Sequence, residues 1–437
     1  FALVVGMIAF FSVTTFALNE VEKKKGSDLY AQVELFASVL TTVRAEYVEE
    51  KDPKTLIYGA LSGMLSSLDP HSQFLEPEDY IELKTDTQGK FGGIGIEITT
   101  KDGSLTIITP IEDTPAWKAG LQAGDKIVKI DKDITRDMTL SDAVKKLRGN
   151  PGTKVALTVF REDEMRIHEY TITREIIHIQ DVKDVHVVED NVGYIRLTEF
   201  REDSFKEFEK GLKELKGKGI DSLIVDLRNN PGGLLSSAID ISELFLPDGQ
   251  LIVSTKGRDQ AQNVVNKSSN KNPDYLTLPV VVLINKGSAS ASEIVAGALK
   301  DNKRAVIIGE KSFGKGSVQS VIPLPDGSGL RLTTAKYYTP SGVSIHGVGI
   351  TPDVVVERKT PPEEEDAEDK KDKKKAEDIE KVFDEITPKD ESKPHAVVDE
   401  KQAALSKKDK DDNQLQAALN VIKGIRTYRN FTRLGAN

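Results

Sequence analysis

A turn of small residues is the segment of this 437-residue chain best suited to carry a nucleophile. Its sequence, KGSASASE (286–293), follows the apolar run 278–284 and precedes a helical pattern. A strand, a turn and a helix in this order would expose a serine hydroxyl at the end of a sheet, and the first N–H groups of the helix could stabilise an oxyanion. Ser288, Ser290 and Ser292 are all candidates. A turn of this composition is more often only a helix N-cap, so the chemistry requires a second group.

That second group must be a general base that accepts the serine proton near neutral pH. None of the six histidines is close to the turn in sequence. A buried lysine can serve, although lowering its pKa from about 10.4 to near 7 costs about 4–5 kcal/mol. Lys315 lies between two glycines, which allow close backbone approach, whereas Lys311 is better explained as a solvated lysine. Gln319 follows four residues after Lys315, and on a continuing turn or helix its amide would lie beside the lysine nitrogen.

A glycine-rich segment, FGGIGI (91–96), predicts a binding site for a carboxylate. The backbone N–H groups around Gly92, Gly93, Ile94 and Gly95 could converge on the anion, and the strand that follows offers an edge to an extended peptide. Downstream, PAWKAGLQAGDKIVKI (115–130) resembles the signature of bacterial PDZ domains, which implies capture of a peptide's C-terminus.

Arg148 ends a helix predicted over 140–148, with Thr139 as its N-cap. It could pair with the carboxylate of a bound peptide or with a neighbouring domain. A cation that complements the C-terminal end of the helix dipole explains it equally well.

The spacing of apolar residues divides the chain into segments that must position these groups. Residues 27–66 predict helices, and residues 91–172 predict short alternating strands with one helix. From 185 to 356, buried-looking strands alternate with helices, which indicates an α/β domain with a largely parallel sheet. Charged blocks follow, and apolar periodicity returns only at 413–425, which predicts one docking helix.

The apolar stretch 1–18 predicts an export signal or a membrane anchor. The expected domains are therefore a signal or anchor (1–20), a helical region (21–88), a PDZ domain (89–174), an α/β peptidase core (175–357) and a charged linker with a C-terminal helix (358–437).

Composition excludes several other functions. The net charge is −10 and basic residues are mixed with acidic ones, so no nucleic-acid partner is expected. The chain has no cysteine, and its histidines form no metal-binding spacing, so we expect neither a metal nor a cofactor.

Seven motifs in order resemble the carboxyl-terminal processing peptidases over roughly residues 30–356. Besides the PDZ signature they are SLDPHSQFL (67–75), VGYIRLTEF (192–200), DLRNNPGG (226–233), GSASASE (287–293), GKGSVQ (314–319) and KYYTPSGVSIHGVGITPD (336–353). The resemblance implies a multidomain fold of α/β and β parts, in which the PDZ domain is inserted into a serine-peptidase core with a helical N-terminal region and a charged C-terminal tail.

By this resemblance Ser290 is the acylating serine, Lys315 is the base and Gln319 holds the lysine. Only Ser290 fits the spacing of the family, so Ser288 and Ser292 are fallback nucleophiles. The N–H of Ala291 and that of either Gly232 or Gly233 would form the oxyanion hole.

The family further implies an exported endopeptidase that processes or degrades envelope proteins. It would be periplasmic or otherwise extracytoplasmic, either free or anchored to the inner membrane by the N-terminal segment. Its substrates would have exposed apolar C-termini, an adaptor could assist it, and terminal helices could assemble it into a homo-oligomer. The PDZ domain could block the active site until a peptide docks. The alternative is a catalytically inactive PDZ scaffold, but the serine and the lysine are both present.

Overall fold

The computed structural model describes residues 28–101, 103–270, 274–359 and 412–434. The apolar segment expected to be a signal or anchor, and most of the charged linker, lie outside these residues. None of the described helices is long and apolar enough to cross a membrane. The chain forms two compact units, of which one combines residues up to Tyr80 with Gln319–Thr333 and the other holds the remainder.

The smaller unit is built on helices and a short sheet. Residues 28–46 are helical, and α2 (Pro53–Ser66) follows. Strand β1 (Gln73–Leu75) pairs antiparallel with the first part of β18 (Gly329–Tyr338). A small apolar core joins these elements through Tyr58, Leu65 and Phe74, against which Leu324, Leu330 and Leu332 pack.

A β-rich domain occupies the region that carries the PDZ signature. Its sheet has the strand order β3-β4-β5-β7-β8, with β6 (Asp133–Ile134) beside β5. The bounds are β3 (Ile96–Lys101), β4 (Ser104–Pro110), β5 (Lys126–Ile130), β7 (Lys154–Arg161) and β8 (Arg166–Thr173). The short helix α4 (Pro115–Lys118) and α5 (Leu140–Leu147) complete it. Thr139 accepts a hydrogen bond from the Asp142 N–H, which confirms it as the N-cap of α5.

A two-stranded ribbon frames this domain. Strand β2 (Lys90–Gly93) pairs antiparallel with β9 (Glu175–His178), so the pairing extends past residue 174. Helix α3 (Pro77–Gln88) leads into β2. The chain therefore enters and leaves the β-rich domain through neighbouring strands, as expected of a domain inserted into another.

A second sheet forms the α/β core, with the strand order β10-β11-β12-β15-β16-β19. All its neighbouring strands are parallel except β10 and β11, which confirms the predicted, largely parallel sheet. The bounds are β10 (Val182–Val187), β11 (Val192–Leu197), β12 (Ser222–Asp226), β15 (Val280–Ile284), β16 (Ala305–Gly309) and β19 (Val354–Val355). Strands β12 and β15 are buried along their whole length. Such strands are typical of a parallel sheet covered on both faces.

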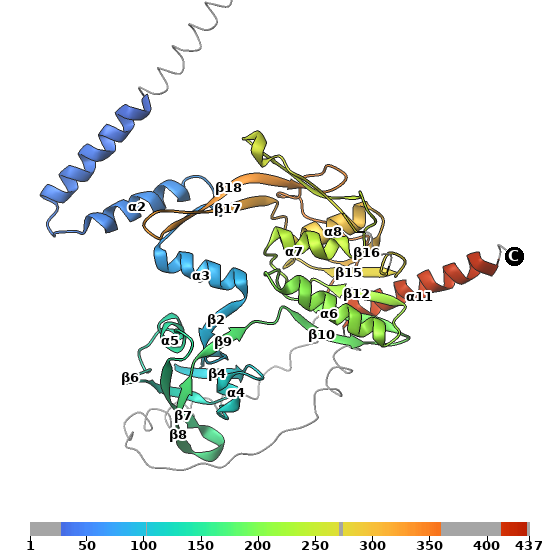
Figure 1. Ribbon diagram of the computed structural model, residues 1–437, viewed down its shortest axis with the longest axis horizontal. Coiled ribbons are helices and arrows are strands. Elements are labelled where there is room, and N and C mark those ends of the chain that lie inside the picture. The colour runs from blue at the N-terminus through green and yellow to red at the C-terminus, as the bar shows by residue number, and fades with distance from the viewer. Residues whose placement is uncertain (1–27, 102, 271–273, 360–411, 435–437) are drawn as a thin grey trace, which may run out of the picture. The chain divides into compact units, whose positions relative to one another are not determined.

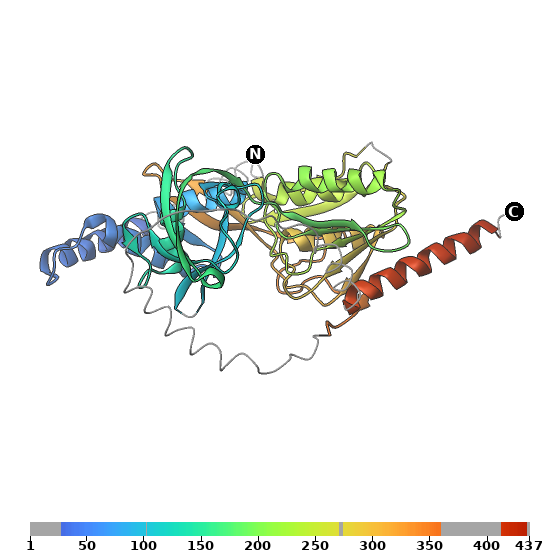
Figure 2. The same cartoon turned by 90° about the horizontal axis from the view of Figure 1, so that it is seen from below.

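Helices cover both faces of this sheet (Figure 1). On one face lie α6 (Ser204–Gly217), α7 (Leu235–Glu243) and α8 (Ala291–Asp301), whose apolar side chains build the largest core of the protein. The other face is covered by α11 (Asn413–Leu434) through Leu415, Ala418, Leu419 and Ile422. This helix is longer than the predicted 413–425, and its last turns extend beyond the sheet (Figure 2).

The last part of β18 continues the sheet that holds β1 and pairs antiparallel with β13 (Leu251–Gly257). Strand β14 (Val265–Lys267) pairs with β13 in turn. Strand β17 (Ser317–Pro323) pairs with β18 and carries Gln319. Segments on either side of the proposed lysine are therefore tied into sheets.

Candidate active site

Ser290 occupies the sharp turn between β15 and α8. Its backbone angles, φ 54° and ψ −112°, are strained for a residue with a side chain. A strained strand-to-helix turn of this kind exposes the nucleophile of other hydrolases. Ser290 is nevertheless 8% exposed, because neighbouring loops pack against the turn.

The two alternative serines are held in structural roles. Both are completely buried. The Ser288 hydroxyl donates to the carbonyl oxygen of Leu227 at 2.8 Å, and that of Ser292 donates to the carbonyl oxygen of Asn230 at 2.9 Å. These bonds fasten the serine turn to the loop that follows β12. Of the three serines, Ser290 has the geometry of a nucleophile.

The glycine pair of DLRNNPGG lies directly against the serine turn. A Cβ atom built on Gly232 would be 2.7 Å from the Ser290 Cβ and 2.9 Å from the Ala291 nitrogen. A Cβ atom on Gly233 would be 2.0 Å from the Phe200 carbonyl oxygen. Both glycines have positive φ, at 105° and 136°. Glycine is therefore required at both positions by conformation and by space.

The backbone donors beside Ser290 differ in their partners. The N–H of Gly232 donates to the side-chain oxygen of Asn230 at 2.9 Å. Among the described residues, neither the Gly233 N–H nor the Ala291 N–H has a hydrogen-bond acceptor. Two unbonded N–H groups near a nucleophile are the elements of an oxyanion hole.

The loop that carries Lys315 is held beside the serine turn, at the carboxyl ends of the parallel strands. The Phe313 N–H donates to the Ser288 carbonyl oxygen at 3.0 Å. The N–H groups of Ser290 and Lys315 donate to one carboxylate oxygen, Oε2 of Glu293, at 2.8 and 2.9 Å. Lys315 is half-buried. The structure thus brings together two segments that are 25 residues apart in sequence.

Gln319 lies in a different local structure from the one expected. Residues 317–323 form β17, so the expectation of a turn or helix continuing from Lys315 is wrong. Lys315 precedes this strand, so the four-residue spacing that would place the two side chains on one face of a helix does not apply. The Gln319 amide donates to the Thr333 hydroxyl of β18 at 3.4 Å. Pairing of β17 with β18 overrides the local pattern.

The motif SLDPHSQFL is organised by one carboxylate. Asp69 Oδ1 accepts hydrogen bonds from the N–H groups of His71 and Ser72 and from the Thr333 hydroxyl. Burial acts to raise the pKa of Asp69, but these bonds outweigh it and hold the pKa below its ordinary value. The motif therefore fastens the segment before β1 to β18.

The glycine-rich entry to the PDZ domain also differs from expectation. Gly92 and Gly93 belong to β2 and pair with β9, so they do not form a turn whose N–H groups converge. Only Gly95 of the three has a positive φ, 81°. Ile94 is buried in the core of the domain. The predicted carboxylate site is therefore reduced to the backbone around Ile94 and Gly95.

The Arg148 guanidinium contacts side chains of β2 and α3. It lies 4.7 Å from the centre of the Phe91 ring and 3.7 Å from the Glu82 carboxylate of α3. The contact with Glu82, which precedes the expected PDZ domain, favours the predicted pairing with a neighbouring domain.

Contacts of Arg228 anchor the C-terminal helix, and they were not predicted from the sequence. Arg228, between β12 and the glycine pair, is held by Asp226 and donates to Asp412 Oδ1 at 2.9 Å and to Gln414 Oε1 at 3.0 Å. Asp226 also accepts the Tyr194 hydroxyl at 2.6 Å, and burial together with this carboxylate raises the pKa of Tyr194. A charged pair within the otherwise apolar end of a buried strand was the signal available in the sequence.

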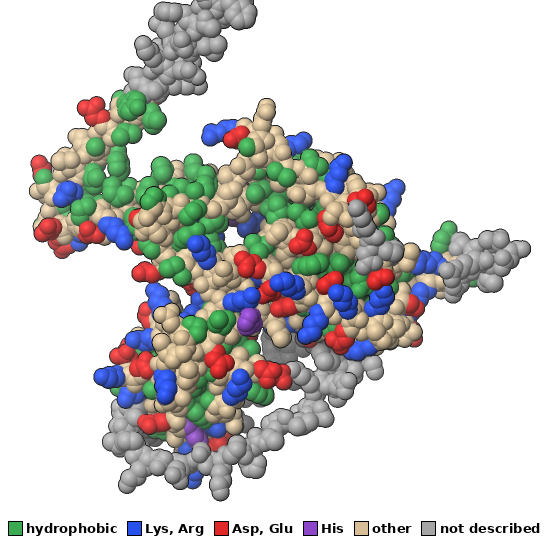
Figure 3. Space-filling view, in the orientation of Figure 1, with side chains coloured by type: hydrophobic (Ala, Val, Ile, Leu, Met, Phe, Trp, Pro, Cys, Tyr) green, Lys and Arg blue, Asp and Glu red, His purple; other side chains and the backbone are tan. Residues whose placement is uncertain are grey.

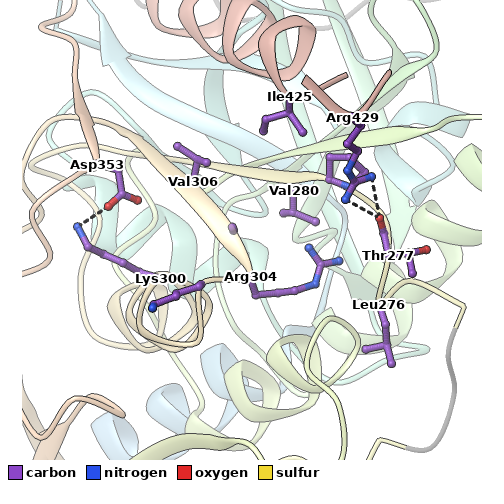
Figure 4. Close-up of a pocket in the computed structure, with 12 residues that line it drawn as sticks. Leu276, Thr277, Val280, Lys300, Arg304, Val306, Asp353, Ile425 and Arg429 are labelled. Atoms are coloured by element: carbon purple, nitrogen blue, oxygen red, sulfur yellow. Dashed lines mark hydrogen bonds and ion pairs between the residues drawn. The ribbon is translucent and has the colours of Figure 1, made fainter. Parts of the chain in front are cut away.

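The pocket drawn in Figure 4 lies away from Ser290. It is lined by Val280 and Val306, near the starts of β15 and β16, and by Arg429 of α11. Ser290 follows the opposite ends of these parallel strands. Within the described ranges, no cluster of acidic and histidine side chains has the composition of a metal site.

The geometry around Ser290 has a known use in enzymes that transfer acyl groups. A strained turn presents the hydroxyl, adjacent N–H groups can stabilise an oxyanion, and a lysine lies on the neighbouring loop. These features define a serine hydrolase. Comparison with known families agrees, because residues 191–356 match peptidase family S41 and residues 106–161 match the PDZ domain.

Curated relatives specify the family further. A carboxy-terminal-processing protease of Bartonella bacilliformis is 43% identical over 92% of this chain and 91% of its own length. A carboxyl-terminal-processing protease of Synechocystis sp. is 42% identical over 69% of this chain and 71% of its own length. The chain belongs to the carboxy-terminal-processing proteases of peptidase family S41, which are serine proteases.

Among solved structures, a Photosystem II D1 C-terminal processing protease is 32% identical. It covers 74% of this chain and 92% of its own, with a TM-score of 0.44.

Proposed function

We propose that the protein is an exported endopeptidase that recognises the C-terminal segment of a protein substrate and cleaves it through an acyl-enzyme. Ser290 is the nucleophile and Lys315 is the general base, and the family resemblance alone assigns Gln319 to orient the lysine. The observation that carries this proposal is the meeting of the Ser290 turn, the glycine pair and the Lys315 loop at one edge of the core sheet.

The chemistry follows from a neutral lysine amine. Lys315 accepts the hydroxyl proton of Ser290 while the serine oxygen attacks the carbonyl carbon of the scissile bond. The tetrahedral intermediate collapses as the resulting ammonium returns the proton to the leaving amine. Water then attacks the ester, with its proton passing to Lys315 and on to the released Ser290 oxygen. The lysine thus acts as base and acid in both halves of the reaction.

The oxyanion of the intermediate would be stabilised by two backbone donors. We assign Ala291 and Gly233 to this role because their N–H groups have no acceptor among the described residues, whereas the Gly232 N–H is bound to Asn230. Loss of one oxyanion donor typically lowers kcat about 10²–10³-fold. Gly232 contributes instead by leaving space for the serine turn.

The PDZ domain would select the substrate. Backbone groups around Ile94 and Gly95 would hold the terminal carboxylate, and the edge of β3 would pair with an extended peptide whose terminal side chain is apolar. Occupancy of this domain could control access to Ser290. An adaptor protein could deliver substrates to it.

An extracytoplasmic location and self-assembly complete the proposal. The apolar segment 1–18 supports export, with processing or degradation of envelope proteins as the task and anchoring to the inner membrane as an option. The helix at 28–46 bears exposed apolar side chains, seen in green in Figure 3, and α11 exposes Tyr428 and Phe431. Surfaces of this kind favour a homo-oligomer formed through terminal helices.

The test compares the protein with its Ser290→Ala, Lys315→Ala and Lys315→Arg variants on an unstructured protein substrate with an apolar C-terminus. We expect all three variants to lose at least 10³-fold in kcat and to bind a C-terminal peptide like the parent protein, since an arginine cannot act as the base. An inactive parent protein that still binds the peptide would indicate the scaffold instead. Activity retained by Ser290→Ala would exclude this mechanism.

A further inference from the structure

Glu293 is a buried carboxylate that the proposed chemistry does not use. It lies in the first turn of α8, three residues after Ser290, and its side chain is inaccessible to solvent. Burial of a carboxylate is unfavourable unless hydrogen bonds compensate for the lost hydration. Its partners therefore indicate what it is retained for.

Four donors converge on this carboxylate. Oε1 accepts the Ser312 hydroxyl at 2.5 Å and the Gly314 N–H at 2.7 Å. Oε2 accepts the N–H groups of Ser290 at 2.8 Å and Lys315 at 2.9 Å. One oxygen thus joins the backbones of the proposed nucleophile and the proposed base, and the other fastens the loop just before the lysine.

The hydrogen-bond pattern favours an ionised carboxylate. The three backbone N–H groups can only donate, and Ser312 already accepts the Ile350 N–H at 2.6 Å, so its hydroxyl proton is directed to Glu293. A protonated Glu293 could offer its O–H only to Ser312 Oγ, and the Ser312 hydroxyl would then no longer donate to the carboxyl group. Burial raises the pKa of Glu293, but the four hydrogen bonds oppose that rise.

We infer that Glu293 is the positioning residue of the active site, because its single buried charge sets the distance between the backbones that carry Ser290 and Lys315. This inference rests on the proposed roles of those two residues. The backbone angles of Ser290 are strained, so an acceptor for its N–H helps to hold the turn. The bond to Lys315 fixes the origin of the lysine side chain relative to that turn.

Besides positioning, the negative charge of Glu293 has a consequence for the protonation of the Lys315 amine. A nearby negative charge favours the protonated form of an amine, and Glu293 lies at the backbone of Lys315, so we expect its charge to raise the pKa of the lysine. Removal of the charge should make the amine neutral at lower pH while its position becomes less well defined. A residue with only a structural role would lower activity without moving the pH profile.

Other titratable groups near this region must be distinguished from Glu293. Glu310 and Lys311 lie on the same loop as Lys315. His346 is exposed, and its backbone nitrogen would be 2.1 Å from a Cβ atom built on Gly316. A His346→Gln variant is therefore included in the pH measurements, and its profile should match that of the parent protein.

The decisive variant is Glu293→Gln, which keeps the size of the side chain and removes its charge. We expect kcat to fall at least 10-fold with KM little changed, and the rise of kcat with pH to move about one unit toward lower pH. Glu207→Gln is the matched control, since Glu207 is a half-buried carboxylate of α6 that accepts the N–H groups of Asp181 and Val182. It should retain the parent kcat and pH profile.

A second variant covers the case in which Glu293→Gln does not fold. Ser312→Ala removes one donor from the carboxylate and should lower kcat about 3–10-fold through looser positioning, by loss of about one hydrogen bond. Its control is Ser242→Ala, because Ser242 is a buried serine of α7 whose hydroxyl donates to the Ala238 carbonyl oxygen.

The outcomes separate this inference from the proposed function. Activity in Ser290→Ala would overturn the catalytic assignment itself. An inactive Ser290→Ala together with a folded Glu293→Gln of parental kcat and pH profile would overturn only the role of Glu293. If Glu293→Gln does not fold, a parental kcat in Ser312→Ala would overturn that role.

Discussion

Gly232 and Ser290 are packed so closely that a side chain on Gly232 would overlap the Cβ atom of Ser290. The distance to a Cβ built on Gly232 is 2.7 Å, and the Ala289 carbonyl oxygen is equally close. These two atoms and the Ala291 nitrogen, at 2.9 Å, are all backbone or Cβ atoms of the turn itself, so none of them can rotate away. The position of the nucleophile therefore depends on a residue 58 positions earlier in the chain.

Gly232→Ala should consequently abolish proteolysis. The added methyl group must displace the Ser290 turn or the loop after β12, so we expect kcat to fall at least 100-fold, which corresponds to a misplacement on the order of 1 Å. Hydrolysis of an unstructured protein substrate measures the effect.

Gly219→Ala is the control for the backbone conformation. Gly219 also has a positive φ, 78°, but a Cβ atom there would meet nothing within 4 Å. This variant should lose about 1–2 kcal/mol of stability and retain its kcat. Equal activity of the two variants would contradict the steric argument.

Asp412→Asn should weaken the docking of α11. Arg228 loses a charged partner, so the free energy of unfolding at pH 7 should fall by about 1.5–3 kcal/mol. Glu189→Gln is the control, because its pair with Lys423 of the same helix is exposed and should contribute less than about 1 kcal/mol. Urea unfolding measures both variants.

The pH dependence of this difference follows from the pKa of Asp412. Burial acts to raise that pKa, but the hydrogen bonds and charge of Arg228 outweigh it, so the pKa is lowered in the folded protein. The stabilisation is then fully present above the unfolded pKa of about 3.9 and lost as the pH falls through the lowered folded value. Parent and Asp412→Asn proteins should therefore converge in stability in acid. A difference that persisted below the folded pKa would point to another origin.

Asp125→Asn should destabilise the PDZ domain. Asp125 is buried and accepts two hydrogen bonds from the Arg161 guanidinium, both at 2.8 Å. Breaking a buried pair of this kind typically costs about 3–5 kcal/mol. Faster hydrogen exchange confined to the strands of this domain is the expected readout. Asp133→Asn, which removes an exposed partner of Lys146, should leave exchange nearly unchanged.

Removal of metal ions should not inhibit the enzyme. The proposed mechanism activates Ser290 with an amine and stabilises the oxyanion with backbone N–H groups, so no step depends on a metal ion. We expect the same kcat after dialysis against a chelator as before it. Inhibition that is reversed by adding a divalent cation would contradict the mechanism.

The sequence predicted much of this protein because its local patterns and its tertiary packing agree. Apolar runs such as 280–284 favour interior strands of a covered sheet, and Thr139 caps its helix through a bond to a residue three positions away. Gln319 is the opposite case. Its spacing from Lys315 suits a helix, but β17 gains its hydrogen bonds from β18, and that pairing decides the conformation.

The sequence by itself determined the class of chemistry, since a PDZ signature, a serine turn and a lysine between glycines follow one another in the order of a known peptidase family. Tertiary structure alone decided which backbone donors stay unbonded, that Glu293 joins the serine and lysine segments, and that Arg228 reaches a helix 184 residues away. The physical reason is that buried polar groups must find partners wherever the folded chain brings them, and such partners need not be close in sequence.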